Sequence, residues 1–224
     1  MKECFADPMV QEYLSGLGVT AYLTLACTLA AYVIGVPIGV ILTVTDKDGI
    51  RPNRIVNAVL GFIVNIFRSV PFIILLVIVL PLTKLIVGTK VGNAAFMVPL
   101  IIAAAPFVAR MTESSLKEVD SGVIEAAQAM GSTNFQIIRK VLIPEAKPSL
   151  ITGAAIAVTT ILGYTPMATF VGGGGLGAIA VQYGLYRFQP TIMYIASILL
   201  IIMVQILQEV GLKLAKKTDK RIKN

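Results

Sequence analysis

Long apolar runs without charged residues alternate with short polar segments along the chain. A helix needs about 20 consecutive apolar residues to cross a bilayer, and these runs are long enough to do so. The chain is 56% hydrophobic with a mean hydropathy of +0.84, more than a soluble domain of 224 residues needs. The pattern predicts an all-α, polytopic membrane protein. Its five transmembrane helices are expected over about 17–45, 69–86, 91–110, 149–170 and 188–208.

The spans are expected to form a single transmembrane domain over 14–212, followed by a basic tail over 213–224. Two of the spans contain residues that disturb a straight helix. In the second, Arg68 and Pro71 are expected to separate an interfacial or tilted piece from the span itself. In the fourth, Pro166 is expected to break the helix locally, because proline removes one backbone hydrogen bond.

A polar segment over 121–147 separates the third span from the fourth. Glu125 to Met130 favour a helix, and Gly131 can supply the left-handed residue that closes it. Thr133 and Gln136 have the spacing of a capping box for a second short helix, which is expected to end before Pro144. The segment is therefore predicted to be a helix-turn-helix. It could rest on the lipid surface as an amphipathic connector, or project into a groove on a soluble partner.

Lys and Arg are distributed unevenly between the loops of the two sides. Because cytoplasmic loops carry an excess of these residues, the richer side is expected to face the cytoplasm. That side includes the polar segment and the C-terminus, so we expect the N-terminus outside a bacterial cell membrane. The richer side carries fourteen (Lys47, Arg51, Arg54, Arg110, Lys117, Arg139, Lys140, Lys147 and six in the tail) against four (Lys2, Lys84, Lys90 and Arg187).

Two glycine patterns indicate close packing. Gly35 and Gly39 form a small-xxx-small pair in the first span, which is typical of helices that approach closely in membranes. The run Gly172–Gly177 formally satisfies GxGxxG, but a dinucleotide site needs a preceding strand and an acidic residue about twenty positions on. No acidic residue occurs between Glu145 and Glu209. The run is therefore predicted to be a glycine-rich turn that lets two helices approach each other.

Residues for an enzyme active site are missing from the sequence. The chain has no His, and none of its twelve carboxylates falls in the middle of a predicted span. This argues against intramembrane proteolysis, zinc catalysis and ion-coupled transport. No P-loop pattern occurs, so we expect no ATP site, no catalytic residue, no metal ligand and no cofactor on this chain. The net charge of +7 lies in short loops and the tail, which does not indicate nucleic-acid binding.

The polar segment resembles the EAA loop of the permease subunits of ABC importers. That family's pattern has Ile and Leu where this chain has Val141 and Ile143, which are similar in shape. The stretches RSVPFIILLV over 68–77 and GYTPMATFVGGGGLGAIAVQYGLYRF over 163–188 resemble the methionine importer permeases, and the resemblance covers most of 17–208. The loop residues that carry it are Glu125, Ala126, Ala127, Gly131, Val141, Ile143 and Pro144.

This resemblance implies a homodimeric permease driven by two copies of a separate ATPase, which holds ATP and Mg²⁺. It also implies a substrate-binding lipoprotein that delivers L- or D-methionine. For the loop, it implies an ionic contact with the ATPase at Glu125 and a turn at Gly131, within a motif that closes at Pro144. Ala126 and Ala127 would be the small residues that permit close approach. The alternatives are a permease for another amino acid or small solute, and a non-transporting membrane anchor for an ATPase.

Candidates for lining or gating the transport path lie in the fourth span and the segment after it. They could equally serve helix packing or face lipid, because small residues are common at helix contacts in membranes. Arg68, with Pro71 beside it, is expected at the inner interface, either reaching the headgroups or acting in the path. The path candidates are Tyr164, Met167, Gly172, Gly173, Gly174 and Gly175.

Overall fold

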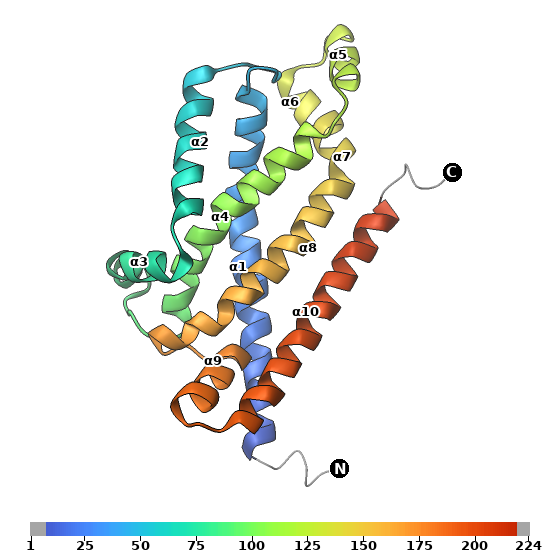
Figure 1. The fold of residues 1–224 in the computed structure, drawn as a ribbon. Helices are drawn as coiled ribbons and strands as arrows, with labels where there is room; N and C mark the ends of the chain where they lie inside the picture. Colours follow the sequence, from blue (N-terminus) through green and yellow to red (C-terminus); the bar gives the residue numbers. More distant parts are fainter. Residues whose placement is uncertain (1–7, 219–224) are drawn as a thin grey trace. The chain divides into compact units, whose positions relative to one another are not determined.

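The structure, a computed structural model, describes residues 8–218, and every regular element within that range is a helix (Figure 1). This confirms the predicted all-α class. Lys2 and residues 219–224 of the predicted tail lie outside the described range. The elements are α1 (Pro8–Thr45), α2 (Arg54–Ser69), α3 (Phe72–Val87), α4 (Asn93–Lys117), α5 (Ser121–Ala129), α6 (Asn134–Ile137), the π-helix η2 (Ile138–Leu142), α7 (Ile143–Glu145), α8 (Lys147–Tyr164), the 3₁₀ helix η3 (Thr165–Val171), α9 (Leu176–Val181), the π-helix η4 (Gln182–Tyr186) and α10 (Pro190–Thr218).

Within residues 8–218, four helical stretches are long and apolar enough to cross a membrane: α1, α4, the stretch from α8 through η3, and α10. α2 and α3 qualify only together, as a bent pair, which gives up to five spans. The break between them lies at Val70 and Pro71, where the sequence predicts it. Pro71 has φ −55° and ψ 134°, an extended conformation from which α3 begins. Proline also disfavours helical backbone at the residue before it, which explains why α2 ends there.

Three helices extend beyond the predicted spans. α1 begins at Pro8 rather than near residue 17, α4 continues past Arg110 to Lys117, and α10 continues to Thr218. An apolar run measures how much of a helix is suited to lipid, whereas backbone hydrogen bonding can continue into water for as long as helix-forming residues follow. The charged residues at these ends therefore mark the end of the apolar run and not the end of the helix.

The chain divides into two compact units, each assembled from three separated segments. Unit 1 comprises the described parts of 1–29, 70–103 and 158–208. Unit 2 comprises 30–69, 104–157 and the described part of 209–224. The four long helices α1, α4, α8 and α10 each contribute one part to each unit.

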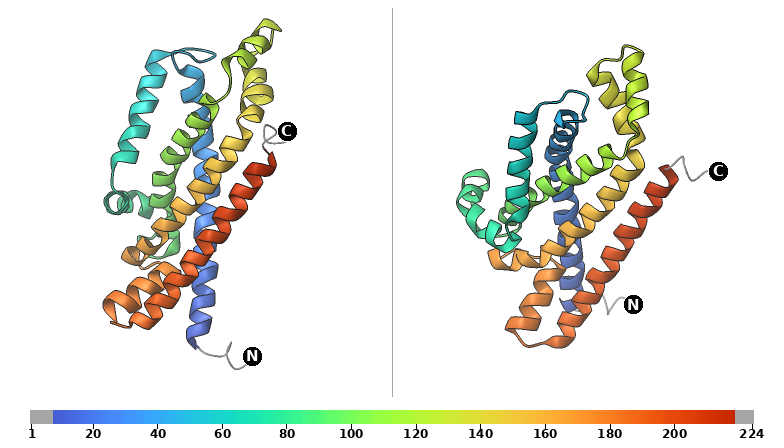
Figure 2. Two further views of the ribbon diagram at one scale, coloured as in Figure 1. Left: turned by 45° about the vertical axis from the view of Figure 1, so that its right-hand side comes forward. Right: turned by 45° about the horizontal axis from the view of Figure 1, so that its top comes forward.

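In unit 2, the second part of α1 packs closely against α4 through two glycines. A Cβ atom on Gly39 would lie 2.5 Å from the carbonyl oxygen of Ala109, and one on Gly35 would lie 2.6 Å from the backbone of α4. Glycine permits this approach because it has no Cβ, which confirms the close packing predicted from the spacing. α2 runs beside the same part of α1 (Figure 2), and Leu42, Val64 and Ala109 form a buried cluster there.

In unit 1, the short helix α9 packs against the first part of α1 and the beginning of α10 (Figure 1). Leu176, Ile179 and Tyr183 form a buried cluster with Ala196 of α10. The Thr20 hydroxyl of α1 accepts the backbone N–H of Leu176 at 2.9 Å. This bond satisfies a donor at the start of α9, where no earlier turn of helix supplies an acceptor.

The fourth span changes from an α-helix to a 3₁₀ helix at Thr165, beside the proline that the sequence singles out. The Thr165 hydroxyl donates to the carbonyl of Leu162 at 2.7 Å. Gly177 lies directly against Pro166, because a Cβ atom on the glycine would come within 2.5 Å of the proline Cα. The helix changes type beside the proline but is not broken there, because the stretch stays helical from Lys147 to Val171, and the glycine of α9 fills the space beside it.

Candidate functional site

The first helix of the polar segment, α5, is closed at both ends by local hydrogen bonds. The Asp120 carboxylate accepts a backbone N–H of the first turn at 2.7 Å. At the other end, the N–H of Ser132 donates to the carbonyl of Ala127 at 3.1 Å, and that of Gly131 donates to Gln128 at 2.9 Å. Gly131 has φ +77°. These two bonds with a left-handed glycine form a Schellman motif, so the predicted glycine turn is confirmed.

The second helix begins with the predicted capping box. The Thr133 hydroxyl accepts the backbone N–H of Gln136 at 3.3 Å, and the Gln136 side chain accepts the N–H of Thr133 at 2.8 Å. Both bonds satisfy donors that the first turn of a helix leaves free. Because each bond links residues three apart, the turn between α5 and α6 is determined locally.

The prediction that this helix ends before Pro144 is wrong. The backbone stays helical through η2 and α7, and α8 begins at Lys147. Just before the proline, the N–H of Ile143 bonds to the carbonyl of Ile138, five residues earlier. Such a π-turn widens the helix, which makes room for a proline ring that would clash with the carbonyl four residues before it.

A buried apolar cluster anchors the polar segment to the rest of unit 2. Its centre is formed by Leu116 of α4, Leu142 of η2 and Ala146 at the start of α8. Ile124 of α5 packs against this cluster, so side-chain packing joins α5 to α4 and to the residues before α8. Partly buried apolar residues complete the cluster: Val40, Ile50, Val119, Ile124 and Leu150.

Most of the predicted coupling residues are exposed. Glu125 and Ala126 of α5 are exposed, as are Gly131 and Pro144. Ala127 is only 2% exposed, so it packs inside this chain and does not belong to the outer surface. The exposed set is compatible with contact to another protein, and its role in coupling stays a prediction.

Two large apolar side chains flank the glycine turn, and they were not singled out from the sequence. Met130 is 79% exposed and Phe135 is 68% exposed. We call these two residues, together with the exposed Glu125 and Ala126, the docking face. The position of a large apolar residue on either side of Gly131 is the signal that could have identified them.

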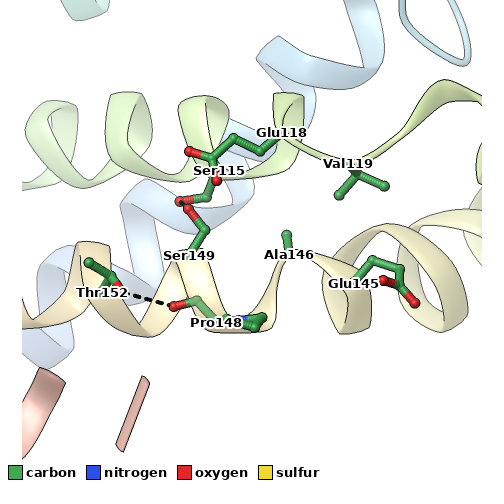
Figure 3. A pocket seen from close by; sticks show the side chains of 8 residues that line it. All are labelled: Ser115, Glu118, Val119, Glu145, Ala146, Pro148, Ser149 and Thr152. Atoms are coloured by element: carbon green, nitrogen blue, oxygen red, sulfur yellow. Dashed lines mark hydrogen bonds between the residues drawn. The ribbon is translucent and has the colours of Figure 1, made fainter. Parts of the chain in front are cut away.

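Two cavities border the anchoring cluster. One of about 520 Å³ lies between the segment after α1, the end of α4 and α5; Asp46, Lys117 and Glu125 are among its lining residues. The other, of about 370 Å³, lies between α4 and the α7–α8 junction, where the Ser115 and Ser149 hydroxyls approach each other at 3.0 Å (Figure 3).

A chain of charged and polar side chains crosses unit 2 below the polar segment. Glu113, only 6% exposed, accepts from Arg110 at 2.5 Å and from Lys117 at 2.9 Å. Lys117 also pairs with Asp46 after α1, and Arg110 donates to the Asn65 side chain of α2 at 2.9 Å. The network connects α1, α2 and α4. From the sequence, the charged residues of this network are predicted only to lie in loops. The spacing of Arg110, Glu113 and Lys117, in i, i+3 and i, i+4 pairs on one helix, is nevertheless a signal for pairing.

The network changes the acidity of Asp46. A hydrogen bond from the Lys117 ammonium, with a further one from the backbone N–H of Lys47, lowers the pKa of the Asp46 carboxyl below its ordinary value of 3.8. Both bonds stabilise the ionised carboxylate more than the protonated acid.

Of the path candidates, Tyr164 and Met167 are half-buried at the junction of α8 and η3. The Tyr164 ring stacks on Phe72 of α3 with centroids 4.8 Å apart. Phe72 in turn contacts Phe96 of α4 edge to face at 5.9 Å. This aromatic group joins three helices of unit 1, which gives Tyr164 a packing role. Its role in the path stays a prediction.

The four glycines after η3 form a tight turn. Gly172 and Gly175 have φ +66° and +112°, conformations that other residues rarely adopt. A Cβ atom on Gly173 would lie 3.0 Å from the Asn93 side chain of α4. The same side chain accepts the N–H of Gly174 at 2.7 Å. The predicted close backbone approach is therefore confirmed, and gating by these residues stays a prediction.

Arg68 is exposed near the end of α2, and Pro71 is exposed in the break before α3. Their expected place at the inner interface stays a prediction.

The sequence was compared with known families and proteins. A family model described as "Binding-protein-dependent transport system inner membrane component" matches residues 35–217. A probable D-methionine transport system permease protein from Vibrio cholerae is 48% identical over 202 residues, which cover 90% of each chain. A methionine import system permease protein from Bacillus subtilis is 43% identical over 181 residues, which cover 81% of this chain and 82% of that protein.

The fold was compared with solved structures. A chain from an inward-facing methionine ABC transporter, MetNI, has a TM-score of 0.93 and 44% sequence identity. The match covers 96% of this chain and 99% of that one. An amino acid ABC transporter solved with histidines has a TM-score of 0.74 at 19% identity, which shows a shared fold alone.

Proposed function

Since this chain belongs to the binding-protein-dependent transport system inner membrane component family, we propose that it is the permease subunit of an ATP-driven importer for D- and L-methionine. The main support for methionine as the substrate is the 48% identity to a probable D-methionine permease across 90% of both chains. The methionine transporter structure, similar over nearly the whole chain, supports the same substrate.

Energy for transport comes from a separate ATPase, present in two copies, which binds ATP and Mg²⁺. The docking face supports this part of the proposal. It combines one carboxylate with two exposed apolar side chains, Met130 and Phe135, on a turn with both helix ends capped. A rigid, mostly apolar projection fits groove recognition, because little conformational entropy is lost when it binds.

Motion passes from the docking face into the membrane helices by contact. Displacement of α5 would act on α4 and α8 through Leu116, Leu142 and Ala146. The network around Glu113 would carry it to α1 and α2. Two copies of the chain would enclose the path, and a rigid-body change would open it alternately to each side.

The orientation follows from the charge distribution. The polar segment and the C-terminus face the cytoplasm, the N-terminus lies outside, and a binding lipoprotein delivers substrate from that side. The excess of Lys and Arg on the inner loops supports this topology in a bacterial cell membrane.

Uptake of labelled methionine by cells with and without this chain tests the substrate. We expect uptake to require the chain, and unlabelled D- and L-methionine to compete better than other amino acids. Competition by a different amino acid would assign another solute. Unchanged uptake after deletion would favour the non-transporting anchor.

Copurification with the ATPase tests the coupling surface. Glu125→Lys should reduce the amount of ATPase that copurifies with the chain, because it reverses the charge of the docking face. Glu118→Lys is the matched control, because Glu118 is an exposed carboxylate outside the docking face. Equal ATPase recovery from both variants would contradict the proposed contact. The purified chain alone should hydrolyse no ATP.

A further inference from the structure

The segment Leu185–Phe188, which comprises the last two residues of η4 and the next two before α10, directs large apolar side chains away from the chain. The exposed fractions are 61% for Leu185, 60% for Tyr186 and 82% for Phe188. Turns of this kind usually carry small or polar residues, because water surrounds them. Three large exposed side chains within four residues therefore need a partner that accepts apolar surface.

The backbone at Phe188 is strained. Its φ is +52°, and no other non-glycine residue between 8 and 218 has a positive φ. Glycine or asparagine adopts this conformation more readily than a bulky residue. The side chain of Phe188 is almost fully exposed, so packing inside the chain does not offset the strain. Residues in such sparsely populated conformations cluster at binding and functional sites.

Several contacts hold the segment in place. The N–H of Arg187 donates to the carbonyl of Gln182 at 3.1 Å, and that of Gln189 donates to Tyr183 at 2.8 Å. The Arg187 guanidinium lies 4.5 Å from the centroid of the Tyr183 ring. The Tyr183 hydroxyl donates to Glu12 of α1 at 2.8 Å. The exposed side chains thus project from a rigid base.

The position of the segment indicates which partner it meets. α10, which begins two residues after Phe188, is a candidate span with only 11% of its apolar window buried. Its first turns continue the exposed apolar surface through Tyr194, Ile195 and Ile198. Aromatic residues and cations concentrate where spans leave the hydrocarbon, because their rings and charges suit the headgroup region.

We propose that Leu185–Phe188 is a membrane-interface anchor. Leu185, Tyr186 and Phe188 enter the boundary between the headgroups and the acyl chains, and Arg187 faces the lipid phosphates. Lipid is favoured over a protein partner because the exposed surface is continuous with that of a spanning helix. The inference requires α10 to span the membrane, and it does not depend on the proposed substrate or ATPase.

The absence of tryptophan from the chain makes a direct test possible. Phe188→Trp introduces a single tryptophan, which can be excited selectively over the tyrosines, into the full-length protein reconstituted in vesicles. Lipids brominated near the glycerol end of the acyl chains should quench its emission at least about twofold more than lipids brominated near the chain ends. Acrylamide in the water should quench it weakly.

Two matched variants calibrate the result. Met130→Trp, on the docking face, should be quenched by acrylamide and not by brominated lipid. Tyr22→Trp, at an exposed position within α1, should be quenched by lipid brominated deeper in the chain. If Phe188→Trp behaves like Met130→Trp, the segment lies in water and the proposal is wrong. If neither quencher reaches it, a protein covers the segment, which also overturns the proposal.

A second variant separates anchoring from the effect of the new tryptophan. With Phe188 unchanged, Tyr186→Trp should also be quenched more by lipids brominated near the glycerol end than by lipids brominated near the chain ends. Adding Phe188→Asn keeps a residue that tolerates positive φ while it removes the apolar side chain. Quenching at position 186 should then fall about twofold, because the anchor has lost its most exposed member. An unchanged value would show that Phe188 does not hold the segment at the lipid.

Discussion

Lys117 forms an ion pair with Asp46, which brings the end of α4 against the residue that follows α1. The same ammonium bonds Glu113 at 2.9 Å. One side chain therefore connects the two helices that approach each other through Gly35 and Gly39. Asp46 and Lys117 line the same cavity as residues of α5, so this connection borders the polar segment.

Replacing Glu113 should destabilise the protein. Glu113→Gln removes a buried negative charge that neutralises Arg110 and Lys117, and we expect a loss of about 1–3 kcal/mol in the free energy of unfolding. Thermal unfolding in detergent would measure it. Glu118→Gln serves as control, because that carboxylate is exposed. Equal melting temperatures for the two variants would show that the network contributes no stability.

Acid should weaken the contact at Asp46. The folded pKa of this carboxyl is lowered, so its stabilising effect is complete above the ordinary value of 3.8 and is lost as the pH falls through the lower folded value. Unfolding measured from neutral to acid pH should show a smaller acid-induced loss of stability in Asp46→Asn than in the parent protein. Parallel curves would contradict this assignment.

A substitution at Gly131 should be costly because of the backbone conformation it requires, and not because a side chain would clash with its surroundings. No atom lies within 4 Å of a Cβ placed there, yet φ is +77°. Gly131→Val should therefore cost about 1–2 kcal/mol in the local structure and reduce ATP-driven uptake, while membrane insertion remains normal. Gly131→Asn should retain more activity, because asparagine tolerates this conformation. Normal transport and ATPase stimulation in Gly131→Val would exclude a coupling role for the turn.

Gly39 and Gly18 should respond oppositely to alanine, although both lie in α1. A Cβ atom on Gly39 would clash with the Ala109 carbonyl at 2.5 Å, whereas one on Gly18 meets nothing within 4 Å. Gly39→Ala should lower the free energy of unfolding by about 1–3 kcal/mol through overpacking. Gly18→Ala should be neutral or stabilising by up to about 1 kcal/mol, because alanine favours helix. Thermal unfolding of both variants in one detergent tests the contrast.

Local patterns in the sequence were sufficient for much of the polar segment. The Gly131 turn, and the Thr133–Gln136 capping box, depend on bonds between residues at most five apart, so residue type and spacing determine them. The break at Pro71 is equally local. The prediction failed at Pro144, where a π-turn accommodates the proline and the helix continues.

By itself, the sequence determined that this chain is a helical membrane protein with a structured polar loop, because hydropathy and short-range hydrogen bonding are properties of consecutive residues. Tertiary structure decided which side chains the fold buries. Glu113 became buried through Arg110, Lys117 and the contact of Lys117 with Asp46, and Ala127 turned inward against its own chain. The pairing of Glu113 with Arg110 and Lys117 is local to α4, but the Lys117–Asp46 and Arg110–Asn65 contacts join segments far apart in sequence, and no local pattern specifies which segments will meet.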